Sequence, residues 1–297
     1  MLKPSLQALR PHQWVKNLLV FAPLLFKPER MSETGMLLQS LLAFAAFCMA
    51  ASSIYLLNDI VDRADDQNHP KKRLRPIASG ALPLNAAYVL LGLLVSLTGL
   101  LAWMVQTGEQ SDPLAPFMLW PAAYLALNLL YSFWWKRIVI VDCMCIALGF
   151  QLRVHAGATA ISVDTSNWIL LCTFFFALFL AFCKRYEEIG RQVEASGQTR
   201  KTMRDYSLEF LNMTIGPLAA LSILTYALYT VSPGTIERHG SDRLMFTVPV
   251  VTYGVFRYLY LVYRKSEGGD PAKLLFRDSP LILSGCIYVL LVITLLH

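Results

Sequence analysis

Long apolar blocks alternate with short polar segments along this chain. Blocks with few or no charges lie at residues 36–57, 84–106, 114–133, 138–160, 166–183, 209–231, 244–262 and 279–296. Most approach the roughly 20 apolar residues that a helix needs to cross a bilayer. A shorter block at 15–28 contains Pro23 and predicts a kinked first span. Because only helices or closed barrels satisfy the backbone in lipid, the pattern predicts an all-α polytopic membrane protein with about nine transmembrane helices.

Composition agrees with a membrane protein. The chain is 56% hydrophobic and 15% charged, whereas a soluble domain carries about 25% charged residues. Residues 1–13 lack an apolar core followed by a cleavage site, so we expect the first helix to stay in the mature protein. The six cysteines lie in or beside apolar blocks and are typical of core residues instead of disulfides. We expect one integral membrane catalytic domain over residues 1–297.

Basic residues predict the orientation. Most of the 26 lysines and arginines fall in alternate loops, which the positive-inside bias assigns to the cytoplasm together with the N-terminus. The prediction is an inner (cytoplasmic) membrane protein with its polar motifs facing the cytoplasm. A net charge of +6 on that face suits anionic lipid headgroups or phosphorylated substrates. We expect no nucleic-acid partner, because no recognised binding fold accompanies the basic residues.

The polar segment 55–80 (YLLNDIVDRADDQNHPKKRLRPIASG) gathers acidic and basic side chains directly after an apolar block. If the helix continues, Asn58, Asp62 and Asp66 share one face and Asp59 lies on its flank. Like charges at this spacing repel unless a cation lies among them, and oxygen ligands suit Mg²⁺ completed by substrate phosphates. The alternative is a solvated helix end paired with Lys and Arg. The position beside a lipid-buried helix favours a metal–phosphate site, and Pro70 predicts that the helix ends near it.

Two patterns in this segment resemble the first signature of UbiA-type membrane prenyltransferases, namely Asn58-Asp59-x-x-Asp62-x-x-x-Asp66 and Arg75-Pro76-x-x-x-Gly80. The resemblance covers nearly the whole chain. It implies two pseudo-symmetric helical bundles around a central cavity that opens to lipid. It also implies that the aspartates bind Mg²⁺, which bridges to the diphosphate of a donor substrate.

The resemblance also indicates a branch of that family. Prenyl-transferring members carry a second aspartate motif after the sixth helix, but residues 182–189 here read FCKRYEEI. Residues 10–17 (RPHQWVKN), 69–80 (HPKKRLRPIASG) and 183–187 (CKRYE, expected at the end of the sixth helix) are similar to decaprenyl-phosphate phosphoribosyltransferases. This branch implies phosphoribosyl pyrophosphate as donor, a membrane polyprenyl (decaprenyl) phosphate as acceptor, and pyrophosphate as product.

These patterns predict the following site. The predicted catalytic residues are Asp59, Asp62, Asp66, Lys184 and Arg185. The predicted metal ligands are Asn58, Asp59, Asp62 and Asp66. The predicted substrate-binding residues are Lys16, Asn17, Arg73, Arg75, Tyr131, Lys136, Arg153, Tyr186 and Glu187. For Lys136, topology anchoring at a helix end remains an equal alternative.

Two charged residues lie inside one apolar block. Asp142 and Arg153 are about three helical turns apart, roughly 16 Å, so we expect that they do not pair directly. A charge at such depth faces the interior or finds a partner. We expect Arg153 to reach the substrate cavity, with a structural pairing as the alternative.

Two other functions stay open. One is a UbiA-type enzyme that moves a polyprenyl chain from its diphosphate to an aromatic acceptor. The other is an anionic solute transporter, which is disfavoured because the two halves of the chain show no matched pair of broken helices.

Overall fold

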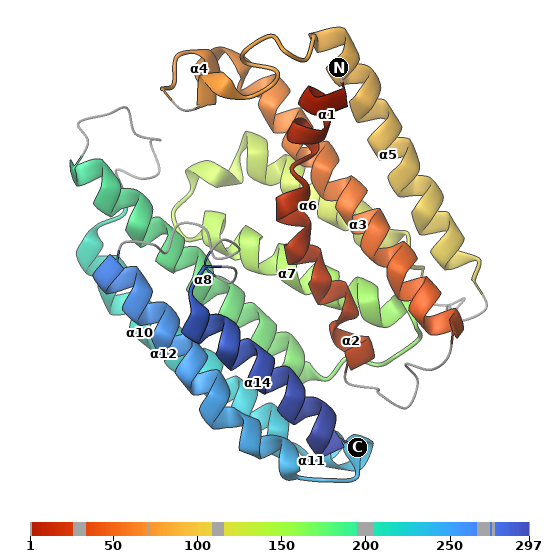
Figure 1. Cartoon of the computed structure of the whole chain (residues 1–297), viewed down its shortest axis with the longest axis vertical. Helices are drawn as coiled ribbons and strands as arrows, with labels where there is room; N and C mark the ends of the chain where they lie inside the picture. The colour runs from red at the N-terminus through yellow and green to blue at the C-terminus, as the bar shows by residue number, and fades with distance from the viewer. Residues whose placement is uncertain are drawn as a thin grey trace. The chain divides into compact units, whose positions relative to one another are not determined.

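The computed structural model describes residues 2–25, 34–70, 72–108, 116–194, 205–265, 274 and 277–296, and these residues form helices and connecting turns without a strand (Figure 1). With η for a 3₁₀ helix, the elements are α1 (Leu2–Leu9), η1 (Pro11–Phe21), α2 (Ala22–Leu25), α3 (Thr34–Val61), α4 (Arg63–Gln67), η3 (Lys72–Leu74), α5 (Leu84–Gln106), α6 (Leu119–Phe133), η4 (Trp135–Arg137), α7 (Val141–Ala160), α8 (Asn167–Glu194), α10 (Leu208–Val231), α11 (Pro233–His239), η5 (Arg243–Thr247), α12 (Val248–Lys265) and α14 (Ser279–Leu296).

The all-α membrane fold class is confirmed. Within the described residues, five helical segments are long and apolar enough to cross a membrane, namely Gly35–Val61, Leu84–Gln106, Asn167–Gly190, Leu208–Val231 and Arg243–Arg264. The segment Ser279–Leu295 is apolar but shorter. Helix α6 has 15 residues, and α7 carries Asp142 and Arg153 within its 20 residues. The count of nine spans therefore stays a prediction.

Helix bounds follow the apolar blocks closely at α5 and α14 and depart from them elsewhere. The block 166–183 corresponds to α8, which continues to Glu194. Residues 183–187 thus lie inside α8, and the expectation that they end the helix was wrong. The first predicted span is an 11-residue 3₁₀ helix, η1, which changes to α2 at Ala22, beside Pro23. Residues 26–28 of that span lie outside the described residues.

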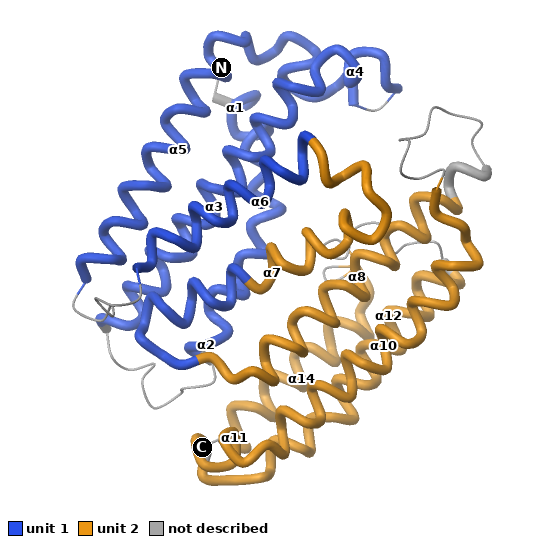
Figure 2. Tube along the Cα trace, turned by 180° about the vertical axis from the view of Figure 1, so that it is seen from behind, with its two compact units in different colours: residues 1–133, 152–164 blue, residues 134–151, 165–297 orange. Residues whose placement is uncertain are grey.

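The chain divides into two compact units (Figure 2). Unit 1 comprises residues 1–133 and 152–164, and unit 2 comprises residues 134–151 and 165–297. One of the boundaries between them falls within α7, between Gln151 and Leu152. A single catalytic domain over residues 1–297 stays a prediction.

In unit 1, α3 packs along α5 and against η1 (Figure 1). Phe47, Val20 and Ala156 are fully or almost fully buried in its largest core cluster. Gly157 of α7 allows η1 to come close, because a Cβ atom built there would lie 1.9 Å from the carbonyl oxygen of Val20. This contact places η1, with Lys16 and Asn17, directly against α7.

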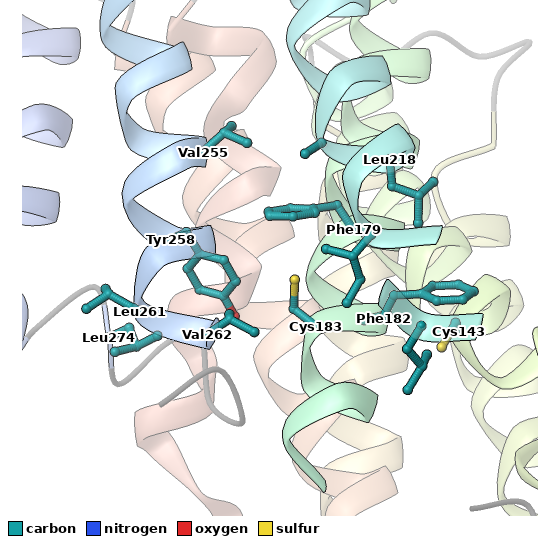
Figure 3. Close-up of a cluster of buried hydrophobic side chains, with 14 of the residues drawn as sticks. Cys143, Phe179, Phe182, Cys183, Leu218, Val255, Tyr258, Leu261, Val262 and Leu274 are labelled. Carbon is teal, nitrogen blue, oxygen red and sulfur yellow. The ribbon is translucent and has the colours of Figure 1, made fainter. Parts of the chain in front are cut away.

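In unit 2, α8 packs along α10, and α12 packs against α10 and α14. Figure 3 shows the core of this unit, in which Phe179, Phe182 and Cys183 of α8 face the other helices. The ring of Phe179 meets the ring of Tyr258 edge-on, with centroids 5.7 Å apart. The packing of these apolar side chains fixes the orientation of α8 about its axis, and with it the orientation of the polar residues that come after Cys183. All six cysteines are free thiols, as expected, and Cys286 is exposed.

Candidate functional site

The acidic segment lies where α3 continues into α4. Asp62 lies between the two helices, and its backbone angles, φ −85° and ψ 9°, depart from those of an α-helix. Its amide nitrogen still bonds to the Asn58 carbonyl oxygen at 2.8 Å, and the Asp66 amide bonds to the Asp62 carbonyl at 2.8 Å. Because the i, i+4 ladder passes through the break, Asn58, Asp62 and Asp66 keep the register that the sequence predicted. Helix α4 ends at Gln67, close to Pro70, as expected.

Two of the four acidic-motif residues are buried beside one arginine. Asp59 and Asp66 are each 2% exposed. The Arg75 Nη1 atom lies 3.1 Å from Asp59 Oδ1 and 2.6 Å from Asp66 Oδ2. The Arg10 Nη2 atom lies 2.6 Å from Asp59 Oδ1, and the Lys72 Nζ atom lies 3.8 Å from Asp66 Oδ1. Buried carboxylates require such partners, because an uncompensated charge away from water is costly.

The other polar residues of this segment are more accessible. Asn58 and Asp62 are half-buried, and Asp65 is exposed, as expected for a solvated residue. Within the described part of the chain, no three His, Cys, Asp or Glu side chains come close enough to hold a metal ion by themselves. The convergent pair is Asp59 and Asp66, and the assignment of all four motif residues as metal ligands stays a prediction.

The donor set at Asp59 and Asp66 fits Mg²⁺. Both carboxylates direct an oxygen at the same cationic nitrogen of Arg75, so a positively charged group already lies where they meet. Mg²⁺ prefers oxygen ligands and is usually held by one or two carboxylates, with waters and substrate phosphates completing its shell. Two buried carboxylates therefore suffice for a phosphate-completed site.

The loop after α4 holds Arg75 in place. The Arg75 amide bonds to the Lys72 carbonyl at 2.9 Å, and the Arg75 carbonyl accepts the Ser79 amide at 2.9 Å. Ile77 is buried in the unit 1 core, and Gly80 adopts φ +77°, which favours glycine. The backbone of Arg75 is thus anchored. Arg73, by contrast, is exposed.

Arg10 was missed as a site residue. It belongs to the N-terminal RPHQWVKN stretch that carried part of the family resemblance, but it was not among the predicted site residues. The residue has φ 51° and precedes Pro11, which begins η1. Its guanidinium carbon also lies 5.2 Å from the ring centroid of Tyr55. Arg10 could have been predicted as a site residue, because it is a cation within a stretch already recognised as similar to the family.

Arg153 is buried among partners from its own unit. Its Nε atom donates to Asn17 Oδ1 at 2.7 Å, and its Nη2 atom donates to the Tyr124 hydroxyl at 3.0 Å. Asn17 in turn donates to the Cys48 sulfur at 3.3 Å. These contacts favour a structural pairing of Arg153, and its substrate role stays a prediction. Tyr124 was missed, because a tyrosine within an apolar block has no distinguishing pattern.

A second polar cluster lies in unit 2. The Arg185 Nε atom of α8 donates to Asp142 Oδ2 at 2.7 Å, and Arg185 Nη1 contacts Glu188. The Tyr206 hydroxyl donates to Asp142 Oδ1 at 2.8 Å and accepts the Ile140 amide at 2.7 Å. Asp142 therefore pairs with Arg185 and not with Arg153, in agreement with their spacing. Burial raises the pKa of Tyr206 well above its ordinary range, so its phenol stays protonated.

The remaining predicted residues lie around these clusters. Lys184 is half-buried, with its Nζ atom 3.9 Å from Glu188 Oε1, and Glu187 is buried. The Tyr186 ring packs on Tyr263 with centroids 5.1 Å apart. Three further members of the set are also half-buried, namely Lys16 on η1, Tyr131 on α6 and Lys136 on η4. The structure thus joins Asp59, Asp66 and Arg75 in one cluster and Asn17 and Arg153 in another; Arg185 pairs with Asp142 and Glu188.

Comparison with known proteins identifies the family. A model described as the UbiA prenyltransferase family matches residues 19–279. The chain belongs to this family. A decaprenyl-phosphate phosphoribosyltransferase from Corynebacterium glutamicum is 34% identical over 280 residues, covering 93% of this chain and 81% of the relative. The protein of the same name from Mycolicibacterium smegmatis is 32% identical over 285 residues, covering 93% and 87%.

A solved structure shares the fold of this UbiA-family chain. The structure of a UbiA homolog from Archaeoglobus fulgidus bound to GPP and Mg²⁺ matches with a TM-score of 0.72 at 18% identity, over 99% of both chains. The predicted family and the predicted class, a membrane-embedded transferase, are confirmed, so the transporter alternative has no support.

Proposed function

We propose that this protein transfers 5-phosphoribose from phosphoribosyl pyrophosphate to a membrane polyprenyl phosphate such as decaprenyl phosphate, releasing pyrophosphate, with Mg²⁺ as cofactor. One observation carries the proposal. The first acidic motif retains a convergent pair of buried carboxylates, whereas α8 has Lys184 and the buried Arg185 where prenyl-transferring members have a second aspartate motif. The similarity to relatives named decaprenyl-phosphate phosphoribosyltransferases supports it.

The charge balance of the substrates explains this difference. A long-chain prenyl diphosphate has one anionic end, which two acidic clusters can hold through two or more metal ions. Phosphoribosyl pyrophosphate adds a 5-phosphate, and the acceptor adds a second phosphate. More anionic groups then require more cationic side chains, and the guanidinium fork of arginine suits phosphate oxygens.

The residues then have the following roles. Asp59 and Asp66 would hold Mg²⁺, with Asn58 and Asp62 as further ligands or orienting groups. When bound, the metal acts as a Lewis acid on the leaving pyrophosphate. Arg75 and Lys184 are candidates to bind phosphates, and the buried Arg185 supports the adjacent Lys184. The acceptor phosphate is already ionised and needs no general base, so the chain's contribution is positioning, charge neutralisation and exclusion of water.

The location of the reaction follows from the charge asymmetry. We propose that the protein lies in the inner membrane with its N-terminus and acidic motif on the cytoplasmic side. The lysines and arginines of the alternate loops support this orientation.

A labelled-donor assay tests the proposal. Purified protein in liposomes receives phosphoribosyl pyrophosphate labelled in the ribose, decaprenyl phosphate and Mg²⁺. We expect label in the lipid fraction and none after addition of a chelator. A parallel reaction offers a prenyl diphosphate and an aromatic acceptor, because the A. fulgidus neighbour was solved with GPP. Consumption of the prenyl diphosphate without entry of ribose label into lipid would favour prenyl transfer.

A further inference from the structure

The guanidinium of Arg75 lies at the point where the two buried carboxylates meet. A single atom, Nη1, is within hydrogen-bond distance of both Asp59 Oδ1 and Asp66 Oδ2, at 3.1 Å and 2.6 Å. Both carboxylates come from the α3–α4 segment, whereas Arg75 comes from the following loop. The two acids, which repel one another in a site with little water, therefore share one charge.

The other cations near these acids are placed differently. Arg10 contacts only Asp59, and Lys72 lies 3.8 Å from the Asp66 oxygen that Arg75 does not contact. Among the described residues, Arg75 is thus the cation that bridges the pair. A divalent metal held by both carboxylates would take the position of its Nη1 atom.

Because the backbone of Arg75 is anchored, its side chain can change position while the loop stays in place. The loop is tied to α4 by the Gln67 Nε2 bond to the Ala78 carbonyl at 3.2 Å, and Ile77 is buried. The Arg75 side chain, however, is 27% exposed, in contrast to its two buried partners. The Arg75 side chain is therefore partly accessible to solvent, whereas the carboxylates it contacts are not.

We propose that Arg75 is a resident cation which a divalent metal displaces, and that the released guanidinium then binds a phosphate of the diphosphate substrate. The inference rests on the proposed function in one respect, that Asp59 and Asp66 are the metal ligands. Metal alone must compete with Arg75 and binds weakly. When a diphosphate is present, the displaced arginine gains a new partner, so diphosphate and metal strengthen each other's binding by the same factor.

Metal titration tests this without the transfer reaction. Full-length protein in nanodiscs is titrated with Mn²⁺, and free Mn²⁺ is measured by electron paramagnetic resonance with and without inorganic pyrophosphate, after subtraction of the Mn²⁺ that pyrophosphate binds in the presence of empty nanodiscs. For the wild type we expect pyrophosphate to tighten Mn²⁺ binding by about tenfold or more, the usual size of such coupling. In Arg75→Gln we expect Mn²⁺ alone to bind about tenfold more tightly and the effect of pyrophosphate to fall to about threefold or less.

Two further variants sharpen the result. Arg63→Gln removes an arginine of α4 that has no ion pair with Asp59 or Asp66 among the described residues, so it should titrate like the wild type. Arg75→Lys keeps the charge but loses the planar fork. It should retain weak binding of Mn²⁺ alone and lose part of the pyrophosphate effect. This variant also serves if Arg75→Gln does not fold, as judged by gel filtration.

The outcomes separate the two proposals. Displacement would be overturned if Mn²⁺ bound Arg75→Gln and the wild type with equal affinity, or if Arg63→Gln gained Mn²⁺ affinity as much as Arg75→Gln. If Arg75→Gln does not fold, an undiminished effect of pyrophosphate on Mn²⁺ binding in Arg75→Lys would overturn it. Each of these results would count against displacement even if ribose label still enters lipid. Failure of label transfer with the expected Mn²⁺ titrations would instead overturn the proposed reaction and leave displacement standing.

Discussion

The Nε atom of Arg185 lies 2.7 Å from Oδ2 of Asp142, and both side chains are buried. The pair joins the start of α7 to the part of α8 that follows its apolar block. Breaking one half of a buried ion pair leaves an uncompensated charge, which is more costly than the pair itself is favourable.

Asp142→Asn should therefore destabilise the protein by up to about 3–5 kcal/mol, the usual cost of removing one partner of a buried ion pair, with the remaining contact of Arg185 to Glu188 offsetting part of it. Thermal denaturation in one fixed detergent, followed by intrinsic fluorescence, provides the measurement. Asp205→Asn is the matched control, because Asp205 is exposed and one residue from Tyr206. Equal melting of Asp142→Asn and wild type would show that the pair does not stabilise unit 2.

Tyr206→Phe should destabilise the protein less, by about 1–3 kcal/mol, because it leaves one Asp142 oxygen and the Ile140 amide without this hydroxyl. Burial raises the pKa of Tyr206 from its ordinary value of 10.0, so its contribution is complete below pH 10 and declines above it. The stability difference between variant and wild type should thus be constant from neutral pH to about pH 9. A difference that changes strongly within this range would contradict the buried phenol.

Asp66→Asn should reduce ribose transfer by roughly 100-fold while the protein stays folded, since the change preserves volume and the part-exposed Arg75 keeps Asp59 as a partner. Asp65→Asn, the neighbouring change on α4, should keep nearly full activity because Asp65 is exposed. Initial rates of label transfer at saturating Mg²⁺ compare the two. Similar losses in both variants would argue against a specific role for the carboxylate that contacts Arg75.

Gly157→Ala should destabilise unit 1 by about 1–3 kcal/mol, because its Cβ atom would overlap the Val20 carbonyl and push η1 away from α7. The displacement should also weaken the bond between Arg153 and Asn17. Gly92→Ala is the control, since a Cβ atom there meets nothing within 4 Å, and alanine favours the interior of α5. In thermal denaturation, we expect a lower melting temperature for Gly157→Ala than for the wild type, and an equal or higher one for Gly92→Ala.

Hydropathy predicted the lipid-facing helices because a span must be apolar along its length. The blocks 84–106 and 279–296 therefore coincide with α5 and α14. Helix α8 shows the limit of this signal. Its apolar block ends at Cys183, but Lys, Arg and Glu form helices well in water, so the helix continues to Glu194. Hydropathy thus marks the part of a helix that lies in lipid and not the end of the helix.

The acidic motif was also predictable, since Asn58, Asp62 and Asp66 repeat at the helical period. Their partners were not. Arg10 and Asp59 are 49 residues apart, and Tyr206 and Asp142 are 64 apart. No periodicity relates such positions, because they meet only when segments far apart in the chain pack together.

The sequence by itself determined that this chain is a helical membrane protein of the UbiA type with one acidic motif, because lipid demands apolar helices and the motif is local in the chain. Only the tertiary structure decided which charges neutralise one another: Arg75 and Arg10 at Asp59, and Arg185 at Asp142. Burial excludes water from these carboxylates, so each must find a cation nearby, and packing selects which cation is near.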